Sequence, residues 1–486
     1  MTDLAFLPAT ELARRVRRGE LSSCELLQHF IARIERLDGG INAVVVRDFE
    51  RARVQADAAD AARARGELRG PLHGVPITVK ESFDVPGLPT TWGFEHLRDH
   101  TVTRHALAVQ RLVEAGAIVL GKTNVPTALA DWQSFNPVYG TTRNPWDPSR
   151  TPGGSSGGSA AALAAGFSAL ELGSDIGASI RNPAHYCGVY GHKPTWGVVP
   201  LQGHELPGDV CADATDIAAA GPLARSAYDL AVALDVISAP LSAFGPLGRV
   251  PVQWRDAGTP VRQLRVAVVT DDACAEVDAS VREGLERLAA FLADQGLAID
   301  TTVRPVQSNE AWEVYMHLLR AATGAQLGDA DYAAAQRHAA AYPPGSTEFP
   351  AWHWRGNTLS HRDWVRYDER RASLRAQWAG FFESWDLLVC PIATSAAFAH
   401  NQQGFRWERM IPVNGRPQPS TQSLFWAGYP GLVGLPATVF PLTQSPEGLP
   451  IGAQVIGPVF GDPVCLRFAC FLEEHWRAFV QPPAMA

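Results

Sequence analysis

The sequence predicts a single large domain of the α/β class, and three observations support this prediction. The first 66 residues carry apolar side chains at helical spacing, such as Leu26, Phe30 and Ile34. From Pro71 onward, short apolar runs bounded by glycine and proline alternate with amphipathic stretches, as buried strands and helices do. Neither an internal repeat nor a convincing linker interrupts the 486 residues.

Composition narrows the class of protein. Hydrophobic residues make up 46% of the chain and charged residues 19%, which is typical of a globular protein. The net charge of −8 and the lack of a basic block argue against a nucleic-acid partner. The sequence contains neither an apolar run of about 18 residues nor the pattern of a signal peptide, so no membrane association is predicted. Seven scattered cysteines without a C-x-x-C pair favour reduced thiols, a cytoplasmic location and no metal site.

The scarcity of lysine singles out three positions. Of 42 basic residues, only Lys80, Lys122 and Lys193 are lysines, and the other 39 are arginines. A desolvated lysine can lose its proton, whereas arginine stays protonated. We therefore expect these three lysines to be needed as lysines, rather than to supply surface charge.

Residues 1–66 are predicted to form an N-terminal helical layer. Thr10 is expected to cap a helix that runs through Arg18. Ser22 and Glu25 have the spacing of a capping box for the next helix, which should end at 38–40 (Asp-Gly-Gly). A helix rich in alanine and arginine is expected over Phe49–Arg65. The apolar faces of these helices indicate ordinary core packing.

Residues 67–200 carry the motifs that indicate chemistry. A strand is predicted over Ile77–Val79, with Thr78 and Lys80 on the same face. A helix over Ala106–Ala115 and a strand over Ala117–Leu120 should follow. The run G-A-I-V-L-G-K-T at 116–123 matches the Walker A phosphate loop literally. That loop requires an irregular segment followed by a helix, whereas here an apolar strand is followed by N-V-P, so we reject the match.

Two turns rich in glycine and serine lie within one stretch. The first, Gly153–Ser159, follows a loop-like segment over 131–150 and leads into an alanine-rich helix over Ser159–Gly166. The second, Gly173–Ser179, should follow a buried strand over Ala165–Leu172. Most stretches of this composition are flexible linkers. The sequence on both sides is apolar and is not of low complexity, which argues against a linker here.

Two familiar serine-hydrolase arrangements do not fit the first turn. The pattern G-x-S-x-G occurs twice, centred on Ser155 and on Ser156. A nucleophile elbow needs a strand directly before it, and the prolines of N-P-W-D-P-S-R-T-P exclude one. His73, His185 and His192 lie near the motifs, but none occurs with an aspartate in a recognisable triad order. We expect each to be a packed or surface imidazole.

The second turn suits acyl transfer. Ser179 closes a glycine-rich turn whose backbone N–H groups can converge on a developing oxyanion. Asp175 and Arg181 flank that turn and are expected to pair as structural support. A neutral lysine can replace histidine as the base, while one serine attacks and another carries its proton to the lysine. The residues alone therefore predict acyl transfer through a covalent intermediate.

Beyond residue 200 the sequence is informative mainly about secondary structure. Aromatic residues gather in 305–430, where they indicate core packing or a substrate pocket. The expected helices cover Gly221–Ile237, Val281–Gln295 and Pro463–Phe479, and the expected strands cover Leu264–Val269, Trp385–Pro391, Gly434–Pro441 and a turn and strand over Gly448–Gly457.

Several motifs together resemble the amidase signature family. They are G-V-P-I through Lys80, G-K-T-N at 121–124, P-G-G-S-S-G-G-S at 152–159 and G-S-D-I-G-A-S-I-R-N-P-A at 173–184, with C-G-V-Y-G-H-K-P-T following. The resemblance covers most of the chain, as far as G-L-P-I-G-A-Q near the end. It implies a Ser–cis-Ser–Lys triad, in which Ser179 is the nucleophile, Ser155 the bridging serine in a cis peptide, and Lys80 the base. It requires neither a cofactor nor a metal.

The resemblance also implies the surroundings of the triad and the fold. An oxyanion hole would be made by the backbone N–H groups of Ile176, Gly177, Ala178 and Ser179, with Ser156, Asp175 and Arg181 in support. The implied fold is one domain over 1–486, a mixed twisted β-sheet covered by α-helices on both faces. Its parts would be the helical layer (1–66), the signature core (67–200) and the remaining sheet, helices and pocket loops (201–486).

One position departs from the family pattern. The family mostly has glycine where this chain has Ala178, and alanine disfavours a positive φ. Either φ is negative at this position, or the oxyanion hole is slightly reshaped.

The predicted function is an amidohydrolase acting on a small or medium carboxamide, with esters or carbamates as further substrates. Two alternatives are the amidase subunit of a tRNA-dependent amidotransferase, which would need a partner protein, and a catalytically silent binding protein. The H-K-P-T-W-G-V-V-P-L-Q-G-H run at 192–204 departs from the pattern expected of the amidotransferase subunit. The sequence leaves a monomer and a homodimer both open.

Overall fold

A mixed sheet of 11 strands runs through the protein, in the order β1-β3-β2-β6-β8-β7-β14-β15-β11-β9-β10. The computed structural model describes residues 3–207, 215–238 and 259–485. The strands of the sheet are β1 (Val44–Arg47), β2 (Pro76–Lys80), β3 (Ile118–Thr123), β6 (Leu170–Asp175), β7 (Tyr190–Lys193), β8 (Ala219–Ala224), β9 (Arg265–Val268), β10 (Ala298–Asp300), β11 (Leu387–Cys390), β14 (Ala437–Gln444) and β15 (Pro450–Ile456). Two small hairpins lie outside it, β4–β5 (Phe135–Asn136 and Gly140–Thr141) and β12–β13 (Met410–Val413 and Arg416–Pro419).

Strand direction brings the two motifs with candidate catalytic residues together. β2 lies between β3 and β6 and runs parallel to both, whereas β6 pairs antiparallel with β8. In the β2–β6 pair, Val79 is opposite Leu172. Parallel strands end at the same edge of a sheet. β2 ends at Lys80, and β6 leads into the second turn. Lys80 and the start of this turn therefore lie side by side.

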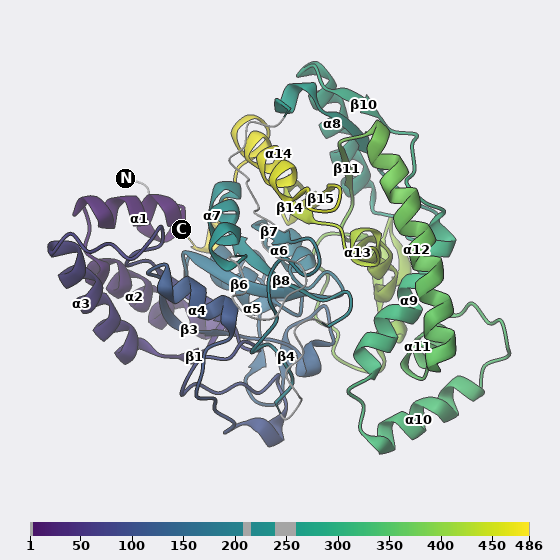
Figure 1. Ribbon diagram of the computed structural model, residues 1–486, viewed down its shortest axis with the longest axis horizontal. Helices are drawn as coiled ribbons and strands as arrows, with labels where there is room; N and C mark the ends of the chain where they lie inside the picture. The colour runs from purple at the N-terminus through teal and green to yellow at the C-terminus, as the bar shows by residue number, and fades with distance from the viewer. Residues whose placement is uncertain (1–2, 208–214, 239–258, 486) are drawn as a thin grey trace.

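Helices cover both faces of the sheet, as predicted (Figure 1). One group, α5 and α6, packs together, and so does another group, α7 and α14. Strands β8 and β14 each contact helices of both groups, and a strand has only two faces, so the groups lie on opposite faces. The α-helices are α1 (Ala9–Arg18), α2 (Ser23–Ile41), α3 (Phe49–Ala64), α4 (Leu107–Glu114), α5 (Gly157–Ala164), α6 (Arg181–Cys187), α7 (Ala227–Ile237), α8 (Ala279–Asp294), α9 (Ser308–Gly324), α10 (Asp329–Ala340), α11 (Phe349–Asn357), α12 (His361–Ser384), α13 (Leu424–Gly431) and α14 (Asp462–His475).

The helical layer before β2 largely follows the prediction. The capping box of Ser22 and Glu25 is present at the start of α2. The expectation for Thr10 is wrong, because its hydroxyl donates instead to Asp229 Oδ1 at 2.7 Å. α2 also continues to Ile41, past the predicted end, and its Asp38 carboxylate accepts hydrogen bonds from the chain that follows the helix.

Two predictions of secondary structure need correction, one of a strand and one of a helix. β6 begins at Leu170 and extends through Asp175, so the first residues of the predicted second turn belong to a strand. The segment around Gly221 and Pro222, expected to start a helix, forms β8 and pairs with β6. A Cβ added at Gly221 would overlap with the carbonyl oxygen of His192. This glycine permits close approach of neighbouring strands rather than a turn.

The Walker-like run is a strand, as expected, and its glycines have structural reasons. Gly116 has a φ of +97°, and a Cβ there would lie 2.6 Å from His73 Cα. A Cβ at Gly121, within β3, would overlap with the carbonyl oxygen of Val46. Both positions therefore require glycine for packing, with no need of a phosphate.

Figure 1 shows α1–α3 at one end of the molecule and α9–α12 at the other, with the two chain ends close together beside α1. Arg33, on α2, donates from its guanidinium to Ala165 O at 2.8 Å and also contacts Met485 O.

Within the described ranges, no helix combines the length and the apolar character needed to cross a bilayer.

Candidate active site

Lys80 lies at the end of β2 and connects both predicted turns. Its side chain is fully buried. Nζ donates to Ser155 Oγ at 2.7 Å and to Ser174 Oγ at 2.8 Å, and it lies 3.5 Å from Ser174 O. The structure thus brings the predicted lysine and bridging serine together. It adds Ser174, which the sequence analysis missed because it lay within an apparent glycine-rich turn.

Burial lowers the pKa of Lys80 to about 7, although the negative charges of Asp175, Glu171 and Glu81 oppose this shift. Glu171 lies on β6 and is itself fully buried, which raises its pKa to about 7. A large fraction of Lys80 is therefore neutral near pH 7 and able to accept a proton.

The first turn contains the predicted cis peptide bond, between Gly154 and Ser155. Asn182, on α6, holds this turn from both sides. Its Oδ1 accepts from Gly154 N at 3.0 Å, and its Nδ2 donates to Gly154 O and to Ala178 O. Asn182 therefore fixes the first turn to the second. Nothing in the sequence pointed to this residue beyond its place in the R-N-P motif.

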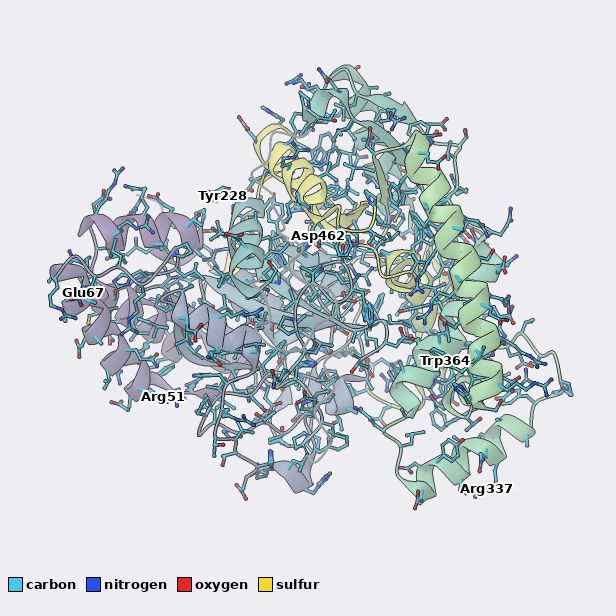
Figure 2. The ribbon with its side chains drawn as sticks, viewed as in Figure 1. Arg51, Glu67, Tyr228, Arg337, Trp364 and Asp462 are labelled. Atoms are coloured by element: carbon cyan, nitrogen blue, oxygen red, sulfur yellow. The ribbon has the colours of Figure 1, made fainter. Side chains whose placement is uncertain are left out.

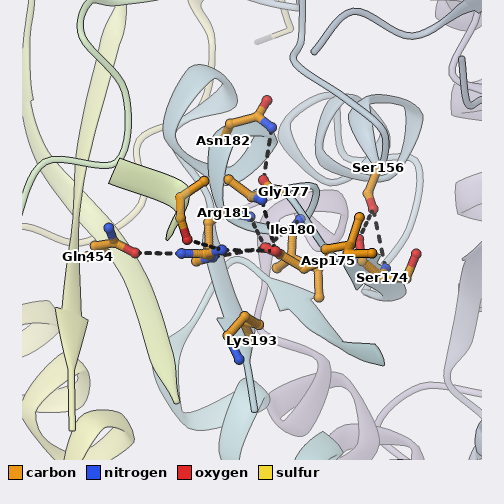
Figure 3. Close-up of polar contacts among 12 residues, drawn as sticks. Ser156, Ser174, Asp175, Gly177, Ile180, Arg181, Asn182, Lys193 and Gln454 are labelled. Carbon is orange, nitrogen blue, oxygen red and sulfur yellow. Dashed lines mark hydrogen bonds and ion pairs between the residues drawn. The ribbon is translucent and has the colours of Figure 1, made fainter. Parts of the chain in front are cut away.

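Ser156 also joins the two turns (Figure 3). Its N–H donates to Ser179 O at 3.1 Å, and its Oγ lies 3.3 Å from Ser174 O and 3.4 Å from Ser174 N. α5 begins directly after it. The hydroxyl of Ser156 thus contacts the backbone at the end of β6, and its supporting role in the reaction stays a prediction.

Asp175 organises the second turn. Its carboxylate accepts from the N–H groups of Ala178, Ile180 and Arg181, and it forms a buried ion pair with the Arg181 guanidinium at 2.9 Å (Figure 3). Burial alone would raise the pKa of Asp175, but the charge and hydrogen bonds of Arg181 hold it below the usual range. Arg181 also donates to Gln454 on β15 at 2.9 Å. The predicted pairing of Asp175 with Arg181 is confirmed.

This arrangement changes the predicted set of oxyanion donors. Ala178 N donates to Asp175 Oδ1 at 2.9 Å, so this N–H is not free to bind a substrate. Ala178 has a φ of +67°, the left-handed conformation that alanine disfavours. In the part of the chain that the structure describes, the N–H groups of Ile176, Gly177 and Ser179 make no hydrogen bond. These three remain as candidate donors.

The carbonyl groups of the same turn are held in place. The Tyr315 hydroxyl on α9 donates to Ile176 O at 3.1 Å, and Trp132 Nε1 donates to Gly177 O at 2.8 Å. With the carbonyls bound, the free N–H groups have a fixed direction before any substrate arrives.

Ser179 is nearly buried, with 5% of its surface exposed. Among the described residues, its hydroxyl makes no hydrogen bond, so none joins Ser155 to Ser179. The contact between these two segments is instead the bond from Ser156 N to Ser179 O.

Among the described residues, the other two lysines and the three histidines near the motifs form no hydrogen bond with Lys80, Ser155 or Ser179. Lys122 donates to Thr90 Oγ1 at 3.0 Å, and Lys193 donates to Pro194 O at 2.8 Å. Both are fully buried, and burial lowers the pKa of each to about 8. His73, His185 and His192 are buried and bonded to neighbouring polar groups, which confirms the expectation of packed imidazoles. Within the described ranges, no three metal-binding side chains converge.

Comparisons with known proteins agree with this chemistry. The amidase family profile matches residues 25–466. The chain is 31% identical over 485 residues to an indoleacetamide hydrolase of Bradyrhizobium diazoefficiens, covering 96% of this chain and 86% of that protein. It is 32% identical over 507 residues to one of the subunits of the glutamyl-tRNA(Gln) amidotransferase of Moorella thermoacetica, covering 97% of each. A crystal structure of an amidase, 29% identical, matches with a TM-score of 0.77 over 96% of this chain and 99% of that one.

Proposed function

The chain belongs to the amidase signature family and is an amidohydrolase, and from that premise we propose how its residues divide the reaction. Ser179 Oγ attacks the carbonyl carbon of the amide, and its proton passes through Ser155 Oγ to the neutral amine of Lys80. The N–H groups of Ile176, Gly177 and Ser179 stabilise the oxyanion of the tetrahedral intermediate.

The second half of the reaction returns each group to its starting state. As the C–N bond breaks, the leaving nitrogen takes the proton back from Lys80 through Ser155. Water then attacks the acyl group on Ser179, and its proton follows the same path to Lys80. As the bond between the acyl carbon and Ser179 Oγ breaks, Ser179 Oγ takes that proton from Lys80 through Ser155, so the carboxylic acid leaves and both the Ser179 hydroxyl and the neutral amine are regenerated.

The observation that carries this proposal is the contact of 2.7 Å between Lys80 Nζ and Ser155 Oγ, inside a fully buried environment. A neutral amine in that position can accept the proton of the Ser155 hydroxyl. The second turn supplies a nucleophile and free N–H donors. The proposal includes the range of amide substrates and the roles of the three triad residues. It also includes a cytoplasmic location and activity without a partner chain.

Mass spectrometry tests the role of Ser179 directly. The purified chain should hydrolyse simple anilides and accumulate an acyl adduct of a slow substrate on Ser179. Ser179→Ala should reduce kcat by at least about a thousandfold while the protein still folds. Ser168→Ala, which removes a buried hydroxyl elsewhere, should keep most of the turnover. An adduct on another residue, or a Ser179→Ala enzyme with near-parental turnover, would refute the assignment.

The 32% identity to an amidotransferase subunit favours a second candidate function, in which the chain works within a tRNA-dependent complex. The chain alone separates the two. Hydrolysis of anilides by the purified chain, at a rate that added tRNA and glutamine do not change, supports the stand-alone enzyme. Activity that appears only with a partner protein supports the alternative.

A further inference from the structure

Two arginines on segments that contact the catalytic turn form no ion pair among the described residues, although the charge of Asp131 acts on Arg406. Arg320 lies on α9 with only 5% of its surface exposed, and Arg406 lies half-buried at the start of a short 3-10 helix, η5 (Arg406–Glu408). Among the described residues, neither guanidinium forms an ion pair or donates a hydrogen bond, and Arg320 Nε is buried without a partner. We call these residues the Arg320–Arg406 pair.

Within the described ranges, the other buried arginines all donate hydrogen bonds from their guanidinium groups, although Arg111 and Arg225 do so to backbone carbonyls and form no ion pair. Arg181 pairs with Asp175, Arg371 pairs with Asp216, and Arg409 pairs with Asp131 at 2.5 Å. A buried cation without a counter-charge costs free energy, because it has lost water and gained nothing in return. Among the described buried arginines, Arg320 alone has neither an ion pair nor a hydrogen-bond acceptor, and this calls for a ligand that supplies both.

The surroundings of the pair disfavour its positive charge, because burial lowers the pKa of both guanidinium groups. The stem of Arg320 packs against α11, where a Cβ added at Gly356 would lie 2.5 Å from Arg320 Cβ. His353, also on α11, lies with its ring 4.8 Å from that of Trp407. Burial and the charges of Arg320 and Arg406 hold the pKa of His353 at about 2. Burial and the charge of Arg406 lower the pKa of Arg320 to about 9, so Arg320 is still charged at neutral pH.

The segments that carry the pair also hold the catalytic turn. On α9, before Arg320, Tyr315 donates to Ile176 O. After η5, Arg409 pairs with Asp131, whose neighbour Trp132 donates to Gly177 O. An anion bound by the pair would thus lie between segments that both touch the proposed oxyanion donors.

We propose that Arg320 and Arg406 form a carboxylate-binding subsite, and that the preferred substrates are amides carrying a carboxylate group. The inference rests on the proposed function, because it assigns the amide bond to Ser179. Guanidinium groups suit this role, since each can donate two parallel hydrogen bonds to one carboxylate. A bound carboxylate would satisfy Arg320 Nε or its neighbouring donors and neutralise the buried charge.

A cavity of about 470 Å³, lined by residues of α9, α11 and α12, offers a comparison. It is lined by further cations, including Arg355, Arg366 and Arg370. Arg366 pairs with Asp363, Arg370 pairs with Glu313, and Arg355 donates to backbone carbonyls. The charge of Arg366 is already compensated by Asp363, so Arg366→Gln is a control for the loss of an arginine in this region.

Matched anilides test the subsite. N-glutaryl-4-nitroanilide carries a carboxylate, and its 5-methylhexanoyl counterpart has an isopropyl group there. A second pair, 4-acetamidobenzoate and 4-isopropylacetanilide, places the carboxylate on the amine side. In at least one pair, the parent enzyme should prefer the anionic member by about tenfold or more in kcat/KM, mainly through KM. Arg320→Gln should abolish that preference and leave the neutral substrates unaffected, Arg320→Lys should retain part of it, and Arg366→Gln should behave as the parent.

Thermal unfolding separates this inference from the proposed function. Without ligand, Arg320→Gln should raise Tm, because it removes an uncompensated buried charge, whereas an arginine with a structural role would lower Tm on removal. Glutarate should raise the Tm of the parent but not that of Arg320→Gln. If no anilide is hydrolysed, the proposed function fails while the glutarate result still decides the subsite. If neutral anilides are hydrolysed but neither preference nor glutarate effect depends on Arg320, the subsite is refuted and the proposed function stands.

Discussion

Lys80 has to lose a proton before it can act as a base, and its surroundings favour that loss. Burial places its pKa at about 7, well below the ordinary value of 10.5. We expect kcat/KM to rise with pH through an apparent pKa near 7, because the neutral amine is the active form. Lys80→Met and Lys80→Arg should both lose most activity, the latter because a guanidinium stays protonated.

A pH profile of kcat/KM for these variants and for Lys122→Met checks this prediction. Lys122 is equally buried but makes its contacts outside the site, so the Lys122→Met enzyme should keep the parental profile. Substantial activity in Lys80→Arg would show that Lys80 is not the base.

Ala178 adopts a left-handed conformation, with a φ of +67°. Such a conformation costs an L-residue about 1–2 kcal/mol, whereas glycine adopts it freely. Glycine also gives the unfolded chain more freedom, which offsets roughly 0.4–1 kcal/mol of the gain. Ala178→Gly should therefore leave the free energy of unfolding equal or raise it by up to about 1 kcal/mol. Activity should persist, because the free donors are at 176, 177 and 179.

The control is Ala162→Gly, in the buried interior of α5. Glycine there should destabilise the protein by about 1 kcal/mol, since the backbone is ordinary helix. Equal losses for both variants in urea unfolding would contradict the strain assigned to Ala178.

At this scale, residue type was more predictable than hydrogen bonding. The scarcity of lysine led to three positions that are all fully buried. The loss of Ala178 as a donor could not be predicted, because it depends on the path that brings its N–H to Asp175. Ser174 was missed for a similar reason, since its contact with Lys80 exists only once β2 and β6 are paired.

Among the elements, α6 links the two catalytic turns through Asn182. Its side chain bonds both peptide groups of Gly154 and the carbonyl of Ala178. Asn182→Ala would leave buried backbone groups unsatisfied, at a cost of about 1–3 kcal/mol. It should also lower kcat by about tenfold or more, because the two turns lose their shared support.

Asn144 provides the matched comparison. It is a buried asparagine whose amide donates to Thr151 O and Tyr186 O, outside the two catalytic turns themselves. Asn144→Ala should cost similar stability with a much smaller effect on kcat. If the two variants lose kcat equally, the effect of Asn182 is general destabilisation, and the link between the turns has no catalytic importance.

Elements with clear periodicity were predicted well, whereas those containing glycine were not. The strand at Ile77–Val79 became β2 with one more residue at each end. By contrast, Gly173 was expected in a turn and Gly221 at the start of a helix, although they lie opposite each other in β6 and β8. Glycine marks either a turn or a close approach of backbones, and only the neighbouring strand distinguishes them.

Considered as a whole, the molecule couples stability to pH through its buried lysines. Their pKa values in the folded state are about 7 and 8, below the ordinary 10.5. At pH values between the folded-state pKa and 10.5, the unfolded chain binds more protons than the folded chain does. The free energy of unfolding therefore rises with pH in this range. Lys122→Met should reduce that slope between pH 8 and 9 by up to about 1.4 kcal/mol per pH unit. Urea unfolding at several pH values measures it, and an unchanged slope would contradict the lowered pKa of Lys122.

The overall architecture followed from the alternation of patterns and the family resemblance, but the arrangement of the long C-terminal region did not. Helices α9, α11 and α12 pack together at the end of the molecule away from the N-terminal layer (Figure 1). Their aromatic residues, including Trp364 on α12 (Figure 2), indicated either core or pocket. To decide between a core and a pocket, one must know which residues surround each aromatic ring in space. The spacing of residues along the sequence does not give this information.

The burial of every lysine has a practical consequence. Reagents that acylate amines find no lysine side chain at the surface of the native protein, because all three have 0% of their surface exposed. Surface cations such as Arg337 on α10 (Figure 2) do not react with these reagents. An amine-reactive ester should therefore leave the lysines of the folded chain unmodified. Lysine modification, followed by mass spectrometry during slow denaturation, would then record the opening of the sheet at β2, β3 and β7 separately.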